Sequence, residues 1–148
     1  MKKSAISQKV SHVLGALMVS LAMVFSFALV GCSSTPKTLE EYMNTEQGKQ
    51  EMDKLQQQAD SMASAFGKMD LAVQGNNILY TVTFDQTFEE NPFKEGTFDD
   101  ATIQELAKAI EDMEKETGVS GCTMEYIFKD SAGTVLADLK IDKSGKVA

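Results

Sequence analysis

The sequence predicts an α+β fold with two layers, in which two helices cover one side of a four-stranded antiparallel sheet. Two kinds of pattern support this prediction. Two segments carry apolar residues at helical spacing, and two others alternate apolar and polar residues on both sides of a turn. The order along the chain is helix, hairpin, helix, hairpin (αββαββ). One apolar stripe on each helix and one apolar face on each hairpin can then bury each other in a single core.

A positively charged and then apolar segment precedes this domain. Residues 1–31 contain lysines but no acidic residue, and residues 13–30 carry no charge. A positive start, an apolar middle and a small residue at the end are the parts of a secretory signal peptide. The apolar run also reaches the lower length limit of a transmembrane helix, so an uncleaved signal anchor is the alternative.

The last residues of this segment, Leu29-Val30-Gly31-Cys32, resemble the lipobox of bacterial lipoproteins. The resemblance implies that the Cys32 sulfur carries a diacylglyceryl group and that a signal peptidase cuts between Gly31 and Cys32. Two acyl chains hold a protein stably at a membrane, whereas one chain binds only marginally. We therefore expect a mature chain anchored through Cys32 to the extracytoplasmic face of the cell membrane.

The domain boundaries follow from this interpretation. Residues 1–31 are the cleaved signal peptide, residues 32–37 (CSSTPK) are a linker, and residues 38–148 form a single small domain. Without residues 1–31 the chain has 11 lysines and 22 acidic residues, which gives a net charge of −11. Nucleic acid is not expected as a partner, because binding phosphates requires clustered cations.

Several catalytic side chains are missing from the mature sequence. It has no Trp and no Arg, and the only histidine, His12, lies in the signal peptide. Histidine-dependent triads and zinc sites that contain histidine are therefore excluded. A carboxylate-dependent cell-envelope hydrolase stays open as an alternative, although acids this abundant give no positional signal. We expect a non-catalytic protein with no metal and no cofactor other than the lipid on Cys32.

The first half of the domain reads as a helix and a hairpin. Thr38 with Glu41 fits a capping box, and the helix that it starts is brief because Asn44 and Gly48 interrupt the pattern. A longer apolar stripe follows and ends near Gly67. Residues 69–84 then alternate around a turn at residues 74–77, which predicts a hairpin. The residues of the helical stripe are Met52, Leu55, Ala59, Met62 and Phe66.

The second half repeats this order after a long connection. A helix begins at Asp99 or Asp100, with acids in its first turn, and ends at Gly118. Residues 122–141 form the second hairpin, with its turn at residues 130–133. The apolar stripe of the helix consists of Ile103, Leu106, Ile110 and Met113. The apolar face of the hairpin consists of Cys122, Met124, Tyr126, Phe128, Val135, Ala137, Leu139 and Ile141.

The mature sequence also resembles known small exported proteins. The repeated helix-and-hairpin unit is similar, at the level of the fold, to PepSY-like domains. Residues 38–141 resemble short Gram-positive lipoproteins known only as a domain of unknown function. The shared features are residues 38–42 (TLEEY), the Asn76-Asn77 turn before Tyr80, and residues 115–118 (KETG). That family implies a Gram-positive membrane and transfers no catalytic residue.

The connection of residues 85–98 is the candidate interaction site. Loops of this length without secondary structure are uncommon unless they are functional or disordered, and three phenylalanines are not typical of disorder. One reading is that the rings fold back onto the sheet while the acids face water. The other is that an exposed ring anchors an envelope protein or a cationic peptide, which the acids attract. The residues concerned are Phe88, Glu89, Glu90, Phe93 and Phe98.

Two further features are assigned to packing and solvation. The methionines show no clustered repeat and most fall on the apolar stripes, so we expect core residues and no copper site. The acids at residues 89–90 and 99–100 do not have the spacing of an EF-hand loop. Cys122 begins an apolar strand pattern and is expected to be buried and unreactive.

Overall fold

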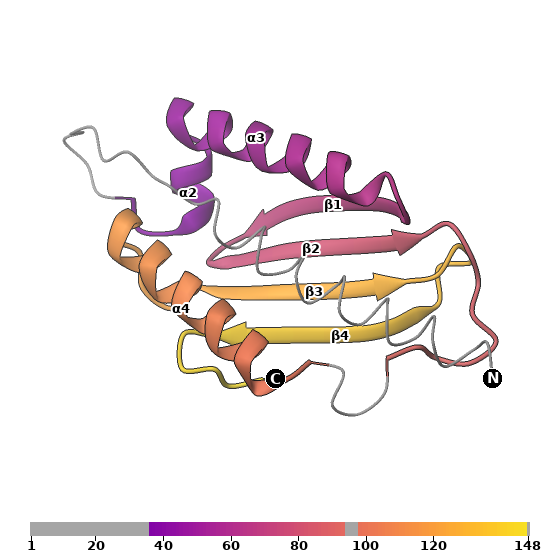
Figure 1. The fold of residues 1–148 in the computed structure, drawn as a ribbon. Coiled ribbons are helices and arrows are strands. Elements are labelled where there is room, and N and C mark those ends of the chain that lie inside the picture. Colours follow the sequence, from indigo (N-terminus) through magenta and orange to yellow (C-terminus); the bar gives the residue numbers. More distant parts are fainter. Residues whose placement is uncertain (1–35, 94–97, 148) are drawn as a thin grey trace.

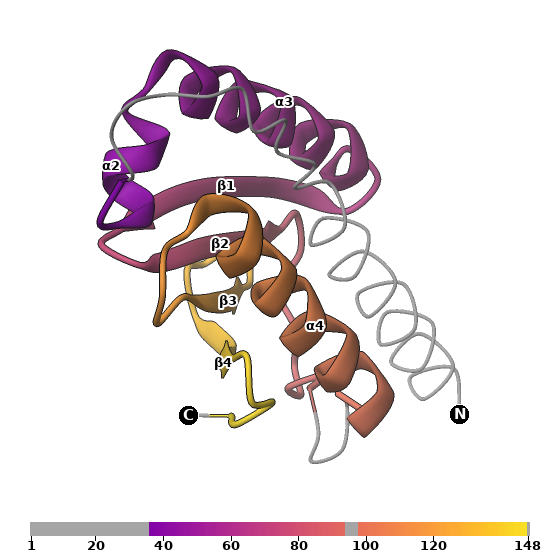
Figure 2. The same ribbon diagram turned by 90° about the vertical axis from the view of Figure 1, so that its left-hand side faces the viewer.

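The structure is a computed structural model that describes residues 36–93 and 98–147. It confirms the α+β class and the four-stranded sheet, with helices α3 and α4 packed on one side of that sheet (Figure 1, Figure 2). The elements are α2 (Leu39–Met43), α3 (Glu46–Ala63), β1 (Gly67–Gln74), β2 (Asn77–Phe84), α4 (Asp100–Thr117), β3 (Thr123–Lys129) and β4 (Val135–Asp142).

The prediction of an all-antiparallel sheet is wrong. The strand order is β1-β2-β3-β4, and the two hairpins are antiparallel as expected, but β2 and β3 pair in parallel. The physical reason is the connection between them. Helix α4 has 18 residues and a length of about 27 Å, close to that of an eight-residue strand. The chain therefore leaves one end of β2, returns along α4, and enters β3 at the end where β2 began.

The predicted order of helices and strands also needs correction. Among the described residues two helices, α2 and α3, precede the first hairpin where one was counted, so the order of the described elements is ααββαββ. Thr38 caps α2 by accepting a hydrogen bond from the Glu41 N–H, and Thr45 caps α3 by accepting one from the Gly48 N–H. Gly48 lies in the first turn of α3, close to the backbone of α2. A larger residue would not fit, because a Cβ at this position would lie 2.1 Å from the Tyr42 carbonyl oxygen.

The predicted end of the first long helix near Gly67 is wrong, because α3 ends at Ala63 and Gly67 begins β1, so Phe66 lies after the helix. The boundaries of α4 and of the hairpin turns agree with the structure. Helix α4 is capped by Asp99, whose carboxylate accepts from the Thr102 N–H, and it ends at Gly118 in the left-handed conformation with φ = 72°. The turns of the two hairpins lie between Gln74 and Asn77 and between Lys129 and Val135. Among the described residues, no helix is both long enough and apolar enough to cross a membrane.

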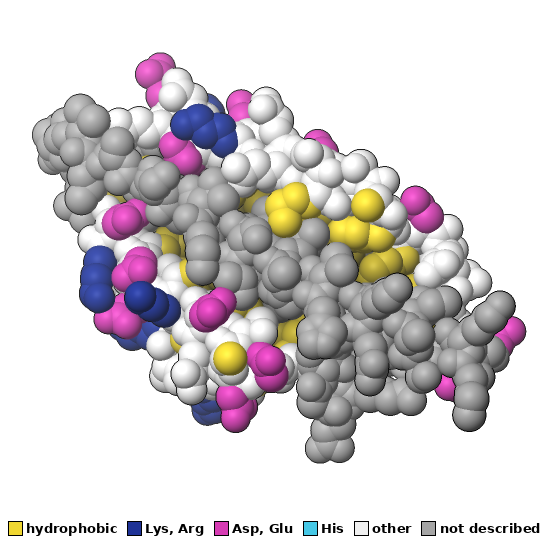
Figure 3. All heavy atoms as spheres, in the orientation of Figure 1, with side chains coloured by type: hydrophobic (Ala, Val, Ile, Leu, Met, Phe, Trp, Pro, Cys, Tyr) yellow, Lys and Arg dark blue, Asp and Glu magenta, His cyan; other side chains and the backbone are white. Residues whose placement is uncertain are grey.

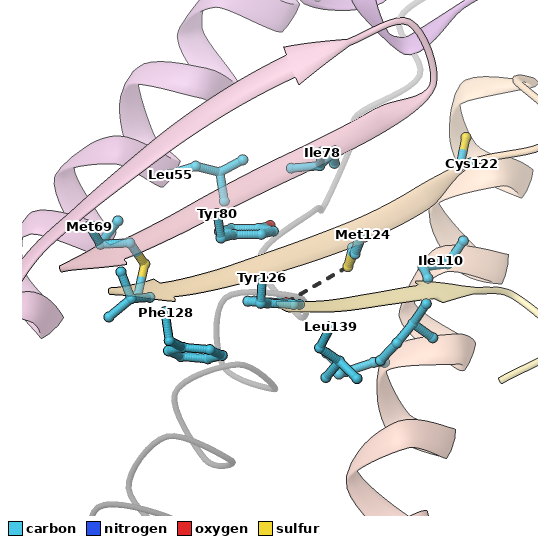
Figure 4. Packing of buried hydrophobic residues seen from close by; sticks show 14 of the residues in the cluster. Leu55, Met69, Ile78, Tyr80, Ile110, Cys122, Met124, Tyr126, Phe128 and Leu139 are labelled. Carbon is cyan, nitrogen blue, oxygen red and sulfur yellow. Dashed lines mark hydrogen bonds between the residues drawn. The ribbon is translucent and has the colours of Figure 1, made fainter. Parts of the chain in front are cut away.

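The core lies between the sheet and the two long helices (Figure 4). The strands β2 and β3 contribute alternate residues that are fully buried, among them Tyr80, Tyr126 and Phe128, and Leu55 and Ile110 approach them from α3 and α4. The rings of Tyr80 and Tyr126 are stacked, with centroids 4.6 Å apart and an angle of 7° between their planes. The helical stripes predicted from the sequence therefore supply the core.

One residue of the predicted apolar face, Val135, lies on the opposite side of the sheet from the core. Val135 has 55% of its surface exposed, whereas the next residue, Leu136, is buried. The register between β3 and β4 shifts at this point, because Lys129 pairs with Val135 and Phe128 pairs with Ala137. The extra residue in β4 is an irregularity of the β-bulge type, which turns a side chain to the other face.

Both edges of the sheet are partly covered. At β1, the Gln56 amide of α3 bonds the backbone as a neighbouring strand would, donating to the Met69 carbonyl at 2.9 Å and accepting from the Leu71 N–H at 3.2 Å. At β4, the Asn91 side chain donates to the Leu136 carbonyl, and Val147 forms a bridge with Ile141. These contacts hinder edge-to-edge pairing with another chain.

Candidate interaction surface

Two phenylalanines meet at one end of the sheet because β2 and β3 are parallel. Phe84 is the last residue of β2, and Phe128 lies beside Val82 near the end of β3. Phe66, just before β1, packs against Phe84 with ring centroids 5.8 Å apart. Helix α4 does not cover this end, since it begins only after the connection of residues 85–99.

The three phenylalanines of the connection complete this cluster. Phe88 contacts Phe84 edge-on at 5.3 Å between centroids, and Phe93 contacts Phe128 at 4.7 Å. Phe98 lies 5.9 Å from Phe128 and 6.0 Å from Phe93. We call this set the aromatic end of the domain; it consists of Phe66, Phe84, Phe88, Phe93, Phe98 and Phe128.

Polar contacts hold the connection against the second hairpin. The Asn91 carboxamide accepts from the Phe93 N–H at 2.9 Å and donates to the Leu136 carbonyl at 2.6 Å, so one side chain fixes both the local turn and its place beside β4. The Gln86 carbonyl accepts from the Ser131 N–H at 3.1 Å. Sequence reasoning missed Asn91; its only signal was a position directly before a proline, where turns are frequent.

The aromatic end combines partly buried rings with exposed acids. Phe88, Phe93 and Phe98 are each half-buried, so each ring packs against the core and keeps part of its surface exposed. Glu89 and Glu90 are exposed beside them. The structure thus brings the predicted side chains together, with the rings folded onto the sheet. Asp85, Asp99 and Asp100 are also exposed in this region.

The linker joins the domain at the opposite end of the sheet. Asn76, in the turn between β1 and β2, accepts from the Leu39 N–H at 3.0 Å and donates to the Ser120 carbonyl at 3.0 Å. Glu40 adds two bonds to Gly75 in the same turn, of 2.9 and 2.8 Å. We call this region, where α2, the β1–β2 turn and residues 118–122 meet, the linker end. The predicted lipidation and cleavage residues Leu29, Val30, Gly31 and Cys32 lie outside the described residues.

A polar network lies on the side of the sheet that carries no described helix. Asn77 accepts from the Thr123 hydroxyl and donates to Glu125, both at 2.8 Å. Asp138 on β4 bonds Glu125 in turn, and its pKa is raised first by partial burial and then by the charge of Glu125. Sequence reasoning missed this carboxyl pair, which only the register between β3 and β4 brings together. Within the described ranges no group of three or more His, Cys, Asp or Glu residues could hold a metal ion.

The described cysteine lies away from the surface. Cys122 is free and has 1% of its surface exposed. Burial, and to a lesser degree the charge of Glu114, raises the pKa of its thiol to about 12. Because the thiolate is the reactive form, this side chain is inert at neutral pH. Cys122 therefore belongs to the core and not to a reactive site.

Comparison with known proteins gives one match. Residues 39–140 match the family described as Domain of unknown function (DUF4854). No curated protein and no solved structure has significant similarity to the chain. The matched region contains the linker end, most of the sheet and all six rings of the aromatic end.

Proposed function

Since the chain belongs to the DUF4854 family, whose description names no activity, we propose its function from its own residues. We propose that it is a lipid-anchored lipoprotein on the extracytoplasmic face of the cell membrane. In this proposal it works as a non-catalytic binding module that meets a basic envelope protein or a cationic peptide. The observation that carries the proposal is the aromatic end, where half-buried rings are bordered by exposed acids.

The positions of the two ends support this role. The linker end lies at the amino ends of β2 and β3, and the aromatic end lies at their carboxyl ends. Eight residues at about 3.3 Å each separate the two ends by about 26 Å. A six-residue linker reaches at most about 20 Å from a lipid on Cys32. An anchored domain can therefore direct its aromatic end away from the bilayer.

Charge supports a basic partner. The described residues contain 10 lysines and 21 acids, a net charge of −11, and acidic side chains are spread over α3 and α4 on the helix-bearing side (Figure 3). Such a surface repels anionic lipid and attracts cations. Long-range attraction of this kind raises the rate of encounter, while the binding energy comes from a few aromatic contacts. The rings and acids of the aromatic end supply both.

Cross-linking in intact cells followed by mass spectrometry tests the binding role. Charge reversal by Glu89→Lys with Glu90→Lys should remove the partner seen with the wild-type protein. The matched control is Glu105→Lys with Asp112→Lys, which reverses two exposed acids on α4 and should retain that partner. If the partner persists after reversal at residues 89 and 90, the aromatic end is not the site.

Lipidation has its own test. The wild-type protein should be found in the membrane fraction, and its N-terminal peptide should begin at Cys32 and carry the mass of a diacylglyceryl group. Cys32→Ala should accumulate as an uncleaved precursor, because lipid transfer precedes cleavage. Intact residues 1–31 on the wild-type protein would contradict the lipoprotein assignment and favour a signal anchor.

One observation favours the alternative, a carboxylate-dependent hydrolase. The carboxyl groups of Glu125 and Asp138 lie close enough to interact, and the pKa of Asp138 is raised by partial burial and by the charge of Glu125. A carboxyl group with a raised pKa beside a second carboxyl group can act as a general acid. Turnover of cell-wall or ester substrates by the purified protein, lost in Asp138→Asn, would establish this function. If neither kind of substrate is turned over, the binding role is retained.

A further inference from the structure

The side of the sheet opposite the helices has an unusual charge balance. The strand register places sixteen side chains on it, and we call this surface the open face. Three of them are lysines and four are acids, so its net charge is −1, whereas the remaining described residues carry seven lysines and seventeen acids, a net charge of −10. In rows across β1 to β4, the open face consists of Gln74, Asn77, Thr123 and Asp142; Ala72, Leu79, Glu125 and Lys140; Asp70, Thr81, Ile127 and Asp138; and Lys68, Thr83, Lys129 and Val135.

Many polar side chains of the open face already have partners on it. Lys68 and Asp70 form an ion pair at 3.3 Å. The chain of bonds from the Thr123 hydroxyl through Asn77 to Glu125 joins β2 and β3. Groups that are bonded to one another can be covered at a lower cost than groups bonded only to water.

The centre of the open face is less polar than its rim. The four central positions, on the two central strands, are Leu79, Thr81, Ile127 and Glu125, and Glu125 is the one charged side chain among them. These four side chains are half-buried within the domain, although no described helix covers them (Figure 2). Six of the twelve side chains at the rim are charged, against one of the four at the centre, and a charged rim around a less charged centre is the anatomy of a protein–protein contact.

We propose that the open face binds a second copy of this chain, so that two sheets pack face to face around a two-fold axis. Face-to-face sheets lie about 10 Å apart. The acidic helices of the two copies then lie on the outer sides, separated by both sheets, and this separation exceeds the Debye length of about 8 Å at physiological salt. Contact through the helices would instead bring together two layers that each carry twelve acids and four lysines in α2, α3 and α4, a net charge of −8.

The size of the open face sets the expected strength. Four strands spaced by about 4.8 Å, each of eight residues with a rise of about 3.3 Å per residue, give the open face an area of about 500 Å² on each copy. The total of about 1,000 Å² lies at the lower limit for a specific interface, so the dimer is weak in solution. Attachment of both copies to one membrane raises their effective concentration and favours the dimer. The covered edges of β1 and β4 hinder the competing edge-to-edge arrangement.

Cysteine cross-linking in cells expressing the full chain tests the proposal. Thr81→Cys places a thiol near the centre of the open face, and the buried Cys122 does not compete because its thiol is unreactive. A short bismaleimide should convert this variant to a species of twice the mass of the chain. Gln58→Cys, at an exposed position of α3, is the matched control and should stay a monomer.

The mass of the cross-linked product distinguishes the possible outcomes. An adduct of Thr81→Cys with a different protein, or no adduct, overturns the proposal, as does equal dimer from both variants. A Thr81→Arg variant provides the second measurement, in sedimentation at high concentration of the purified protein. It should reduce the dimer fraction at least tenfold relative to Gln58→Arg, while the circular dichroism of both variants matches the wild type. The cross-linking test rests on the proposed lipid anchor, because the lipid on Cys32 blocks that thiol and holds both copies on one membrane. Sedimentation of the purified protein uses neither the aromatic end nor the lipid, so its failure leaves the proposed function unchanged.

Discussion

Replacing Tyr80 by phenylalanine should make the protein more stable. Tyr80 is fully buried in the middle of β2, and its hydroxyl has no hydrogen-bond partner within the described residues. Burial raises the pKa of this phenol well above its usual value. A hydroxyl that loses water and gains no partner costs about 1–3 kcal/mol. Tyr80→Phe removes that cost and keeps the ring stacked on Tyr126.

The loss of the oxygen atom creates a small opposing term. A void of about 10–15 Å³ costs about 0.3 kcal/mol at about 24 cal/mol per Å³. The expected gain is therefore about 0.7–2.7 kcal/mol in the free energy of unfolding. For a domain of this size the melting temperature should rise by about 4 °C for each kcal/mol.

Urea unfolding of the mature protein, followed by circular dichroism, measures this change. Tyr126→Phe is the matched control, because the Tyr126 hydroxyl contacts the Met124 sulfur at 3.9 Å. The control should be neutral or destabilising. If Tyr80→Phe lowers the free energy of unfolding by about 1 kcal/mol or more, its hydroxyl has a stabilising partner such as a buried water, and the reasoning is wrong.

Three further predictions concern titration and the linker end. In an alkaline titration followed at 295 nm, Tyr42 alone should ionise in the folded protein. Its pKa lies above the usual value because of partial burial and the charges of Glu51 and Glu116. Simultaneous ionisation of all three tyrosines before unfolding would contradict the buried stack of Tyr80 on Tyr126. Partial burial opposes the ionisation of Glu114, but hydrogen bonds from Lys143 and the Cys122 N–H outweigh it and lower its pKa. The stability from this group is complete above about pH 4.5 and is lost as the pH falls through the lower folded value, so Glu114→Gln should flatten the acid limb of the stability profile. Asn76→Ala should lower the free energy of unfolding in urea by about 2–3 kcal/mol, because it removes two hydrogen bonds and leaves the N–H of the buried Leu39 without its acceptor. A decrease below about 0.5 kcal/mol would show that this turn does not hold the linker end together.

Sequence patterns predicted the elements better than their arrangement. Capping residues locate the start of α2 and both ends of α4 because these signals are local: Thr38, Asp99 and Gly118 each act within one turn of helix. The period of the apolar residues locates α3 and both hairpins. The Gly48 position misled the sequence reading, because a glycine inside a helix looks like an interruption. The glycine is required by a tertiary contact, because the Tyr42 carbonyl of α2 approaches this position too closely for a side chain.

The site was predictable in composition but not in geometry. The spacing of Phe88, Phe93 and Phe98 in a long acidic connection indicated a surface of interest, and the structure brings these rings together. Their contact partners, Phe84 and Phe128, are far apart in the sequence. Only the parallel pairing of β2 with β3 places them at the same end of the sheet.

The connection from β2 through α4 to β3 therefore determines where both proposed binding surfaces lie. A short turn between the hairpins would have made β2 and β3 antiparallel, and Phe84 and Phe128 would then lie at opposite ends of the sheet. The crossover through α4 instead gathers the rings at the end away from the linker and leaves one side of the sheet without a helix in the described part of the chain. The aromatic end and the open face both follow from this topology. They can be tested separately, because residues 89 and 90 lie in the loop after β2 while Thr81 lies within the strand, with its side chain on the open face.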